Sequence, residues 1–313
     1  MKTISVITPC FQEESGIREC YDRVRAVFEE HLPEYRREHL FCDNASSDNT
    51  VTILKDIAAH DPCVKIIVNR RNFGILNNTF NGVINSSGDA TVLFMPADLQ
   101  DPPELIPEFV RLWEAGSEIV YGIRSEREEG FFFRTARRIY YRIISRLSYI
   151  DYPPDVGDFQ LVDRQVIEVM RHFDDAQPFM RMMTFESGFR AVGVPYTWRA
   201  RKSGVSKNQL SNLVEQGMLG LISFSTIPIR LCSLFGVLIA LVSLVYSLSV
   251  FVLGIFVDDL ALRGIPTIIV AIFFFSGVQL LFLGLVGEYI LAIYNQVRRR
   301  PHVIERERVN FSP

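Results

Sequence analysis

The segment most indicative of the fold reads Ala90-Thr91-Val92-Leu93-Phe94-Met95-Pro96-Ala97-Asp98-Leu99-Gln100-Asp101. Its first half, Ala90–Met95, is almost continuously apolar, which is typical of a strand buried on both faces of a parallel sheet. Asp98 and Asp101 follow shortly after the apolar run. We therefore predict a buried strand whose carboxyl end carries carboxylates.

Strand-like and helix-like segments alternate on both sides of this run. The predicted strands are Ile4–Thr8, His39–Cys42, Val64–Val68, Ala90–Met95 and Glu118–Tyr121, and the predicted helices are Ile17–Leu32, Thr50–Ala59, Asn78–Asn85 and Leu105–Trp113. This order predicts a doubly wound α/β sheet, in which ligands bind beyond the carboxyl ends of the strands. We expect three segments to meet at one crevice there: Pro9–Glu13, Asp43 and Pro96–Asp101.

Two uncharged apolar runs, Leu231–Val257 and Ile265–Gly287, occupy the last third of the chain. About 20 apolar helical residues cross a bilayer, so both runs are predicted transmembrane helices. The loop Asp258–Gly264 carries little positive charge, whereas Arg230 and Arg298–Arg300 flank the runs on their other side. The positive-inside rule then places both termini in the cytoplasm. The alternative, a buried hairpin in a soluble protein, is disfavoured by the length of the runs.

Composition narrows the class of protein further. The formal net charge of −3 argues against nucleic-acid binding, which usually requires a basic surface. The five cysteines show neither CxxC pairs nor metal-ligand spacing, as expected of reduced thiols in the cytosol. The strand predicted at the N-terminus leaves no room for a cleavable signal there. We expect an integral membrane protein with a cytoplasmic catalytic domain.

The predicted division of the chain follows from these patterns. Residues 1–207 form the cytoplasmic α/β domain, within which residues 128–150 form an amphipathic helix lying on the membrane; a core-facing helix is the alternative. Residues 208–229 form an amphipathic juxtamembrane helix, residues 230–295 hold the two transmembrane helices (about 231–257 and 265–292), and residues 296–313 form a basic cytoplasmic tail. Because two spans offer little packing surface within the bilayer, a homo-oligomer is a further expectation.

The acidic segment suggests a metal site. Asp98 and Asp101 offer oxygen ligands of the kind that Mg²⁺ or Mn²⁺ prefers, and such ions are often shared with substrate phosphates. A bound cation could neutralise a nucleoside-diphosphate leaving group. Asp101-Pro102 is also an ordinary helix-cap signal, which is the alternative interpretation.

Further stretches along the chain carry a family resemblance. They are Thr8–Glu14, Ser46–Thr50, Asn69–Gly74, Ala97–Ile106, Tyr121–Arg124, Gly157–Asp163, Ser223–Thr226 and Gly287–Tyr289. In these stretches the chain resembles the family 2 glycosyltransferases of the GT-A fold, specifically the polyprenyl-phosphate glycosyltransferases with two C-terminal spans. That group includes the bactoprenol glucosyltransferases and, more distantly, the dolichol-phosphate mannose synthases. The resemblance covers nearly the whole chain in order.

The resemblance implies roles for individual residues. Nucleotide-pocket positions would be Pro9, Phe11, Glu13 and Asp43, although strand-end packing is an equal interpretation of the first two. Asp98 would bind the metal, with Gln100 as a further ligand. Asp158 would be the acid of the catalytic region, orienting or deprotonating the acceptor phosphate, or positioning the sugar; a loop-capping role is the alternative.

Positive charge is needed independently of family, because an acceptor phosphate and a donor diphosphate repel each other. Arg124 and Arg127 follow the fifth predicted strand, where guanidinium forks could grip phosphate oxygens. Arg134 begins the predicted interfacial helix, and Arg201 and Lys207 lie on a glycine-containing loop. We assign Arg124 to the catalytic group and the other four to acceptor-phosphate binding. A plain surface-charge role is the alternative for each.

The chain also departs from the family pattern. Relatives usually carry two adjacent acids where this chain has Cys42-Asp43, and an Asp-x-Asp where it has Pro96-Ala97-Asp98. Pro96 cannot ligate a metal through its side chain, so Asp98 would need further ligands. These changes predict weaker metal binding, an altered donor or lost activity.

The expected function is therefore an inverting transfer of one sugar from a nucleotide sugar to polyprenyl (undecaprenyl) phosphate at the cytoplasmic face. UDP-glucose or a related UDP-sugar is the expected donor, and Mg²⁺ or Mn²⁺ the expected cofactor. One alternative is a catalytically impaired scaffold of the same fold. A processive polysaccharide synthase is another, although its usual Gln-x-x-Arg-Trp motif is missing from this sequence. A transferase of soluble substrates that is merely held at the membrane is the third.

Overall fold

The computed structural model describes residues 1–126, 153, 156–173, 175–197, 227–256, 265–298 and 300–311. The described residues before position 198, together with those after 299, belong to one compact unit. Two long helices, α9 and α10, belong to a second unit. Each unit is described by itself below.

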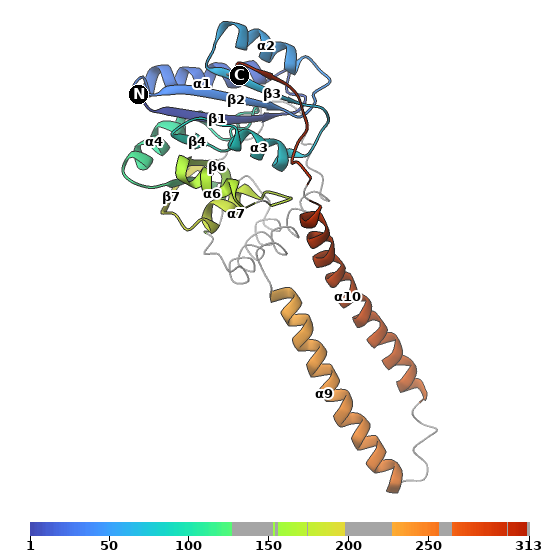
Figure 1. Cartoon of the computed structure of the whole chain (residues 1–313). Helices are drawn as coiled ribbons and strands as arrows, with labels where there is room; N and C mark the ends of the chain where they lie inside the picture. Colours follow the sequence, from blue (N-terminus) through green and yellow to red (C-terminus); the bar gives the residue numbers. More distant parts are fainter. Residues whose placement is uncertain are drawn as a thin grey trace. The chain divides into compact units, whose positions relative to one another are not determined.

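The first unit is built on one eight-stranded sheet in the order β7-β5-β6-β4-β1-β2-β3-β8 (Figure 1). The strands are β1 Thr3–Cys10, β2 Arg36–Asp43, β3 Val64–Asn69, β4 Ala90–Val92, β5 Ile119–Glu126, β6 Val156–Asp163, β7 Ala191–Thr197 and β8 Glu305–Val309. The helices are α1 Ile17–His31, α2 Thr50–His60, α3 Ile75–Ile84, the 3₁₀ helix η1 Pro103–Leu105, α4 Ile106–Glu114, α6 Arg164–Arg171 and α7 Met180–Glu186.

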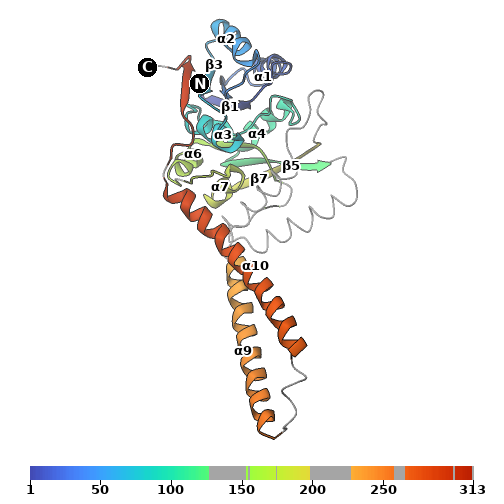
Figure 2. The same cartoon turned by 90° about the vertical axis from the view of Figure 1, so that its right-hand side faces the viewer.

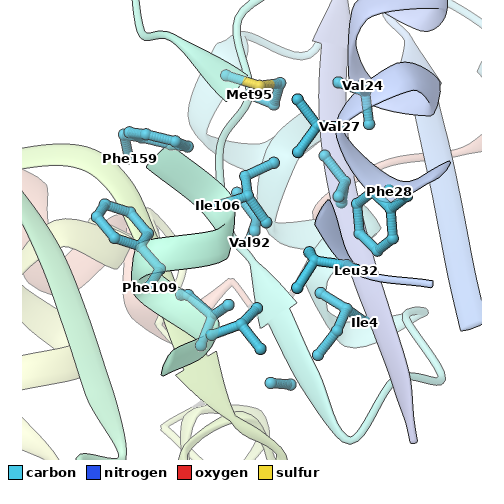
Figure 3. Packing of buried hydrophobic residues seen from close by; sticks show 14 of the residues in the cluster. Ile4, Val24, Val27, Phe28, Leu32, Val92, Met95, Ile106, Phe109 and Phe159 are labelled. Carbon is cyan, nitrogen blue, oxygen red and sulfur yellow. The ribbon is translucent and has the colours of Figure 1, made fainter. Parts of the chain in front are cut away.

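Helices cover both faces of this sheet. Helix α1 buries Cys20, Val24 and Phe28 at helical spacing against Ile4 and Val6 of β1. Figure 3 shows this core continuing through Ile106 and Phe109 to Phe159 of β6. On the opposite face α3 approaches so closely that a side chain at Gly82 would overlap Ile7. The layout confirms the predicted α/β class.

The strand directions correct one expectation. Strands β4, β1, β2 and β3 are mutually parallel, and β5 is parallel to β7, but β6 runs antiparallel to both β4 and β5. The sheet is therefore mixed. The predicted strand Ala90–Met95 also ends early, at Val92, although the amides of Leu93 and Met95 still donate to Gln160 O and Ile7 O, both at 2.8 Å. The apolar run remains in the core after it leaves the regular ladder.

The C-terminal segment differs from the predicted basic tail. Within residues 296–313, Glu305–Val309 forms β8, which pairs antiparallel with β3 and completes one edge of the sheet (Figure 2). Side chains reinforce the pairing, since Asn81 Nδ2 donates to Glu305 Oε1 at 2.8 Å and Lys55 Nζ donates to Glu307 at 2.7 Å. Alternating charges are typical of edge strands, because they discourage pairing with other chains. That pattern looks like a solvated tail when the sequence is considered alone.

Both apolar runs of the last third are helical in the second unit. Helix α9 spans Ile227–Phe256 and α10 spans Ile265–Val297. Among the described residues, one segment, Phe274–Val297 of α10, is long and apolar enough to cross a membrane. Its mean hydropathy is 1.7, and its most apolar stretch is not buried within the protein. In α9 the apolar segment Ile229–Ser243 is shorter. The second span remains a prediction, and the helices expected at 128–150 and 208–229 lie outside the described residues.

Candidate active site

Three strand ends define the candidate site. Strand β1 lies between β4 and β2 and runs parallel to both, so the carboxyl ends of the three strands share one edge of the sheet. Cys10, the last residue of β1, is paired in register with Asp43, the last residue of β2. The structure thereby brings the segment after β1, Asp43 and the segment Pro96–Asp101 to the same edge.

The loop after β1 is fixed to the loop after β2. The amide of Gln12 donates to Ser46 Oγ and that of Glu13 donates to Thr50 Oγ1, both at 2.9 Å. Pro9 is buried within β1, a position that fits strand packing, whereas Phe11 and Glu13 are partly exposed at the edge. The two loops are therefore joined into one surface at this edge of the sheet. Of the three predicted nucleotide contacts in this segment, Phe11 and Glu13 are the two that are not buried.

Asp43 is fully buried at the end of β2 and is only half satisfied. Its Oδ2 accepts a hydrogen bond from the amide of Ser46 at 3.0 Å, while its Oδ1 is buried without a hydrogen-bond partner. Burial raises the pKa of this carboxyl above its ordinary value. Unsatisfied buried acceptors are costly, so they often mark a place where a ligand supplies the missing donor.

Asparagines join the ends of β2 and β3. Asn44 Nδ2 donates to Asn72 Oδ1 at 2.9 Å, and Asn44 Oδ1 accepts from the amide of Phe73 at 2.9 Å. Asn69 Nδ2 donates to Asn78 Oδ1 at 2.8 Å, and Asn78 in turn donates to Cys42 O. This network holds the loop after β3 beside Asp43, a role that the sequence motifs did not reveal.

Cys42, the first residue of the Cys42-Asp43 pair, points away from Asp43 and towards α3. Its side chain is buried against α3, since a Cβ at Gly82 would lie 2.4 Å from Cys42 Sγ. Asp43, the next residue in the strand, necessarily faces the opposite side of the sheet. The cysteine at position 42 is therefore part of the packing beneath α3.

The segment after β4 is a tight turn that exposes Asp98. Leu99 adopts a positive φ of 56° and is buried, and its amide donates to Pro96 O at 3.1 Å. Asp98 Oδ1 accepts from the amide of Gln100 at 3.2 Å. Because Leu99 points inward, Asp98 and Gln100 on either side of it remain partly exposed.

This turn offers a partial set of metal ligands. Within the part of the chain that the structure describes, no group of three Asp, Glu, His or Cys side chains is arranged to hold a metal. One carboxylate and one amide oxygen fit a hard cation whose remaining ligands are substrate phosphates and water. The residues therefore fit a Mg²⁺ or Mn²⁺ ion that binds together with a diphosphate.

Asp101 is engaged elsewhere. It is 1% exposed, it accepts a short hydrogen bond from the Tyr196 hydroxyl, and its Oδ2 accepts from Arg124 Nη2 at 3.2 Å. Arg124 Nε also donates to Tyr196 Oη at 3.1 Å. Burial opposes the charge of Arg124, but the neighbouring carboxylate of Asp101 outweighs it and raises the pKa of the guanidinium. The sequence placed Asp101 near the metal, whereas the structure makes it the counter-ion of Arg124.

Asp158, on β6, is ion-paired with Arg181 of α7. Arg181 Nε donates to Asp158 Oδ1 at 3.0 Å, and a second, short bond joins Nη2 to Oδ2. Burial alone would raise the pKa of Asp158, but the charges of Arg181 and Arg124 more than offset it, so the pKa lies below the ordinary value. Asp158 is thus kept ionised at neutral pH.

Some predicted residues cannot be placed, and others were missed. Arg127, Arg134, Arg201 and Lys207 lie outside the described residues. Sequence reasoning did not single out Arg181 or Tyr196, because a lone arginine in a short helix and a tyrosine in a strand are commonplace. Only the pairing of distant segments shows that they contact Asp158 and Asp101.

The chain is thus a mixed α/β protein with Asp43 and Asp98 at the carboxyl edge of its sheet, the place where ligands bind in open α/β folds. The chain belongs to glycosyl transferase family 2, whose model matches residues 5–171. The family predicted from the sequence motifs is confirmed, and the protein is a glycosyltransferase.

Relatives match almost the entire chain. A Bacillus subtilis glycosyltransferase, YkcC, is 37% identical over 298 residues, covering 95% of this chain and 91% of the relative. The SfII prophage-derived bactoprenol glucosyl transferase of Shigella flexneri is 34% identical over 311 residues, covering 99% of both chains. Among solved structures, a Pyrobaculum calidifontis mannosyltransferase in complex with GDP-Man and Mn²⁺ is 16% identical, with a TM-score of 0.49 over 70% of this chain and 63% of that one.

Proposed function

We propose that the protein is a membrane-anchored inverting glycosyltransferase. It transfers one glucose from UDP-glucose to a polyprenyl phosphate at the cytoplasmic face of the membrane and releases UDP. The observation that carries this proposal is the extent of the similarity to the Shigella flexneri bactoprenol glucosyl transferase, 99% of both chains. That similarity extends beyond the sheet to the apolar helix α10. An enzyme that acts on a lipid acceptor needs such a membrane-associated segment.

The donor side of the proposal rests on the loops after β1, β2 and β4. The buried Oδ1 of Asp43 lacks a donor, and a uracil N–H or a ribose hydroxyl would supply one. Glu13 lies on the adjoining loop and is partly exposed. Asp98 and Gln100 would hold Mg²⁺ or Mn²⁺ together with the diphosphate, and the cation, when bound, would neutralise charge on the leaving group.

The acceptor side rests on the ion pairs made by Arg124 of β5 and Asp158 of β6. Arg124 is fixed by Asp101 and Tyr196, and Arg181 keeps Asp158 ionised. We infer that Arg124 stabilises phosphate charge, and that Asp158 orients the acceptor phosphate or the sugar. Acceptor-phosphate contacts from Arg127, Arg134, Arg201 and Lys207 are part of the same proposal, because two anions must be brought together against their repulsion.

The activity is tested with membranes that contain the full-length protein. They are incubated with radiolabelled UDP-glucose, undecaprenyl phosphate and Mg²⁺ or Mn²⁺, and the lipid is extracted. A labelled lipid that carries one sugar is expected, and chelation with EDTA should abolish it. A polymeric product would indicate a processive synthase instead. No labelled lipid from any of a panel of nucleotide sugars, with no nucleotide binding, would leave only the scaffold alternative.

The membrane topology is part of the proposal. Helices α9 and α10 form a hairpin, with both chain termini in the cytoplasm. In a background lacking Cys63 and Cys232, the two cysteines that are not buried, Asp259→Cys should react with a membrane-impermeant maleimide added outside intact cells, whereas Ser312→Cys should react only after lysis. Equal labelling of the two positions in intact cells would contradict the hairpin.

A further inference from the structure

Tyr196 joins two charged residues that come from distant parts of the chain. Its hydroxyl donates to Asp101, which follows β4, and accepts from Nε of Arg124 on β5 at 3.1 Å. Arg124 Nη2 also donates to Asp101 Oδ2 at 3.2 Å, so the three side chains form a closed triangle. A hydroxyl suits this position because it can donate to a carboxylate and accept from a guanidinium at the same time.

The neighbouring strands leave room for this triangle. A Cβ at Gly122 of β5 would lie 2.6 Å from Tyr196 Cε1, and a Cβ at Gly157 of β6 would lie 3.3 Å from Arg124 Nε. Neither glycine is in the positive-φ region, so backbone conformation does not explain them. The two positions therefore lack side chains where the tyrosine ring and the guanidinium pass.

The triangle is largely buried, so water competes little for its hydrogen bonds. Asp101 is 1% exposed and Tyr196 is 6% exposed, and the ring of Tyr196 packs edge-on against Phe159 at 6.2 Å. Hydrogen bonds to charged groups are stronger than neutral ones, and they hold geometry more firmly where water is excluded. Arg124 also interacts electrostatically with Asp158, so its position affects both charged pairs of the site.

We propose that Tyr196 is a positioning residue for the sugar transfer. It fixes the Arg124 guanidinium against Asp101, and thereby holds it between the turn that carries Asp98 and the carboxylate of Asp158. This inference rests on the proposed function, because it assigns Tyr196 a role in that reaction. Asp101 contributes to the same positioning, because it joins the end of the Asp98 turn to Arg124 of β5 and Tyr196 of β7.

The test compares two Tyr-to-Phe substitutions in the full-length protein. Tyr196→Phe keeps the packed ring and removes the hydroxyl, so the hydrogen bond from Arg124 Nε to Tyr196 Oη is lost. We expect kcat to fall about tenfold or more, with the KM for UDP-glucose changed less than about twofold, because the effect is on positioning and not on donor binding. The affinity for UDP, measured by calorimetry, should equal that of the unmodified protein.

Tyr35→Phe is the matched control. Tyr35 Oη donates to Glu114 at 2.9 Å on the periphery of the sheet, so this variant also loses a tyrosine–carboxylate hydrogen bond. It should keep the full kcat even where its melting temperature falls as much as that of Tyr196→Phe. A fall in kcat for Tyr196→Phe alone supports the inference.

Other outcomes overturn it. If Tyr196→Phe melts earlier but keeps its kcat, or if the two variants lose activity equally, Tyr196 serves stability alone. A parallel rise in the KM for UDP-glucose with kcat unchanged would move its role to the donor pocket, against the inference. An unmodified protein that transfers no sugar would overturn the proposed function and, with it, this inference.

Discussion

Arg181 of α7 grips Asp158 of β6 through two parallel hydrogen bonds, one of them, from Nε to Oδ1, measuring 3.0 Å. Bidentate pairs of this kind fix both the charge and the orientation of a carboxylate. The pair therefore favours the ionised form of Asp158, and Arg181 acts on the site through that carboxylate.

Removing Arg181 should change how activity depends on pH. Burial raises the pKa of Asp158, and the charge of Arg181 is the largest influence that lowers it. In Arg181→Gln burial is no longer offset, so the pKa rises and a larger fraction of Asp158 is protonated at mildly acidic pH. We expect the acidic limb of the kcat/KM profile to move up by about one pH unit or more.

The control for this prediction is Arg111→Gln, which breaks an exposed pair with Glu108 on α4. Its pH profile should match that of the unmodified protein. The ion pair of Asp158 and Arg181 also contributes to stability in a pH-dependent way. The pKa of Asp158 in the folded protein lies below its unfolded value of about 3.9, so the pair stabilises the fold above that pH. Its contribution to the free energy of unfolding fades as the pH falls through the folded pKa. An unchanged acidic limb in Arg181→Gln would show that Asp158 is not needed in its ionised form.

Replacing Asp98 should remove sugar transfer while the fold survives. In Asp98→Asn the amide oxygen can still accept from the amide of Gln100, so the turn is retained, but the negative charge that attracts the cation is lost. We expect the transfer rate to fall about a hundredfold or more, with the melting temperature unchanged. Asp56→Asn, which alters an exposed aspartate paired with Arg18, is the control. Full activity in Asp98→Asn would exclude this residue as a metal ligand.

The sequence located well the strand ends that carry Asp43 and the Asp98 turn, and the reason is local. Strands β1 and β2 and their following loops are short, contiguous segments, so apolar runs and turn residues were enough to place Asp43 and the Asp98 turn at strand ends. Helix α1, expected over Ile17–Leu32 and found over Ile17–His31, was equally clear because its apolar residues recur at helical spacing. These features depend on neighbours in sequence.

What the sequence did not reveal depends on partners far away along the chain. Tyr196 is 95 residues from Asp101, and β8 pairs with β3 more than 200 residues earlier. Nothing in Glu305–Val309 distinguishes an edge strand from a solvated tail, since both are rich in charge. The antiparallel direction of β6 likewise depends on its pairing with β4 and β5, which no local sequence pattern reveals.

Asp43 should contribute to nucleotide affinity through its unsatisfied oxygen. In Asp43→Asn the amide oxygen can keep the bond from Ser46, but an N–H group then replaces the acceptor at the other position. We expect the dissociation constant for UDP to rise about tenfold or more, as is usual when a hydrogen bond to a charged group is lost. Asp89→Asn is the control, because Asp89 also accepts a backbone bond, from the amide of Thr3 at 2.7 Å, but at the amino ends of the strands. Equal UDP affinity in the two variants would place the nucleotide elsewhere.

Asn310 should stabilise the attachment of the C-terminal segment without affecting catalysis. It has a positive φ of 60°, and its Nδ2 donates to Ala58 O and to Val64 O, both at 2.9 Å. Asn310→Ala loses both hydrogen bonds. Alanine also tolerates a positive φ poorly, because its side chain cannot form a compensating hydrogen bond. The free energy of unfolding should therefore fall by about 1–3 kcal/mol. Asn310→Gly relieves the backbone strain but not the lost bonds, and its stability should lie between the two. Denaturation in detergent measures the effect, and kcat should stay unchanged in both variants. If Asn310→Ala were as stable as the unmodified protein, β8 would not owe its position to this residue.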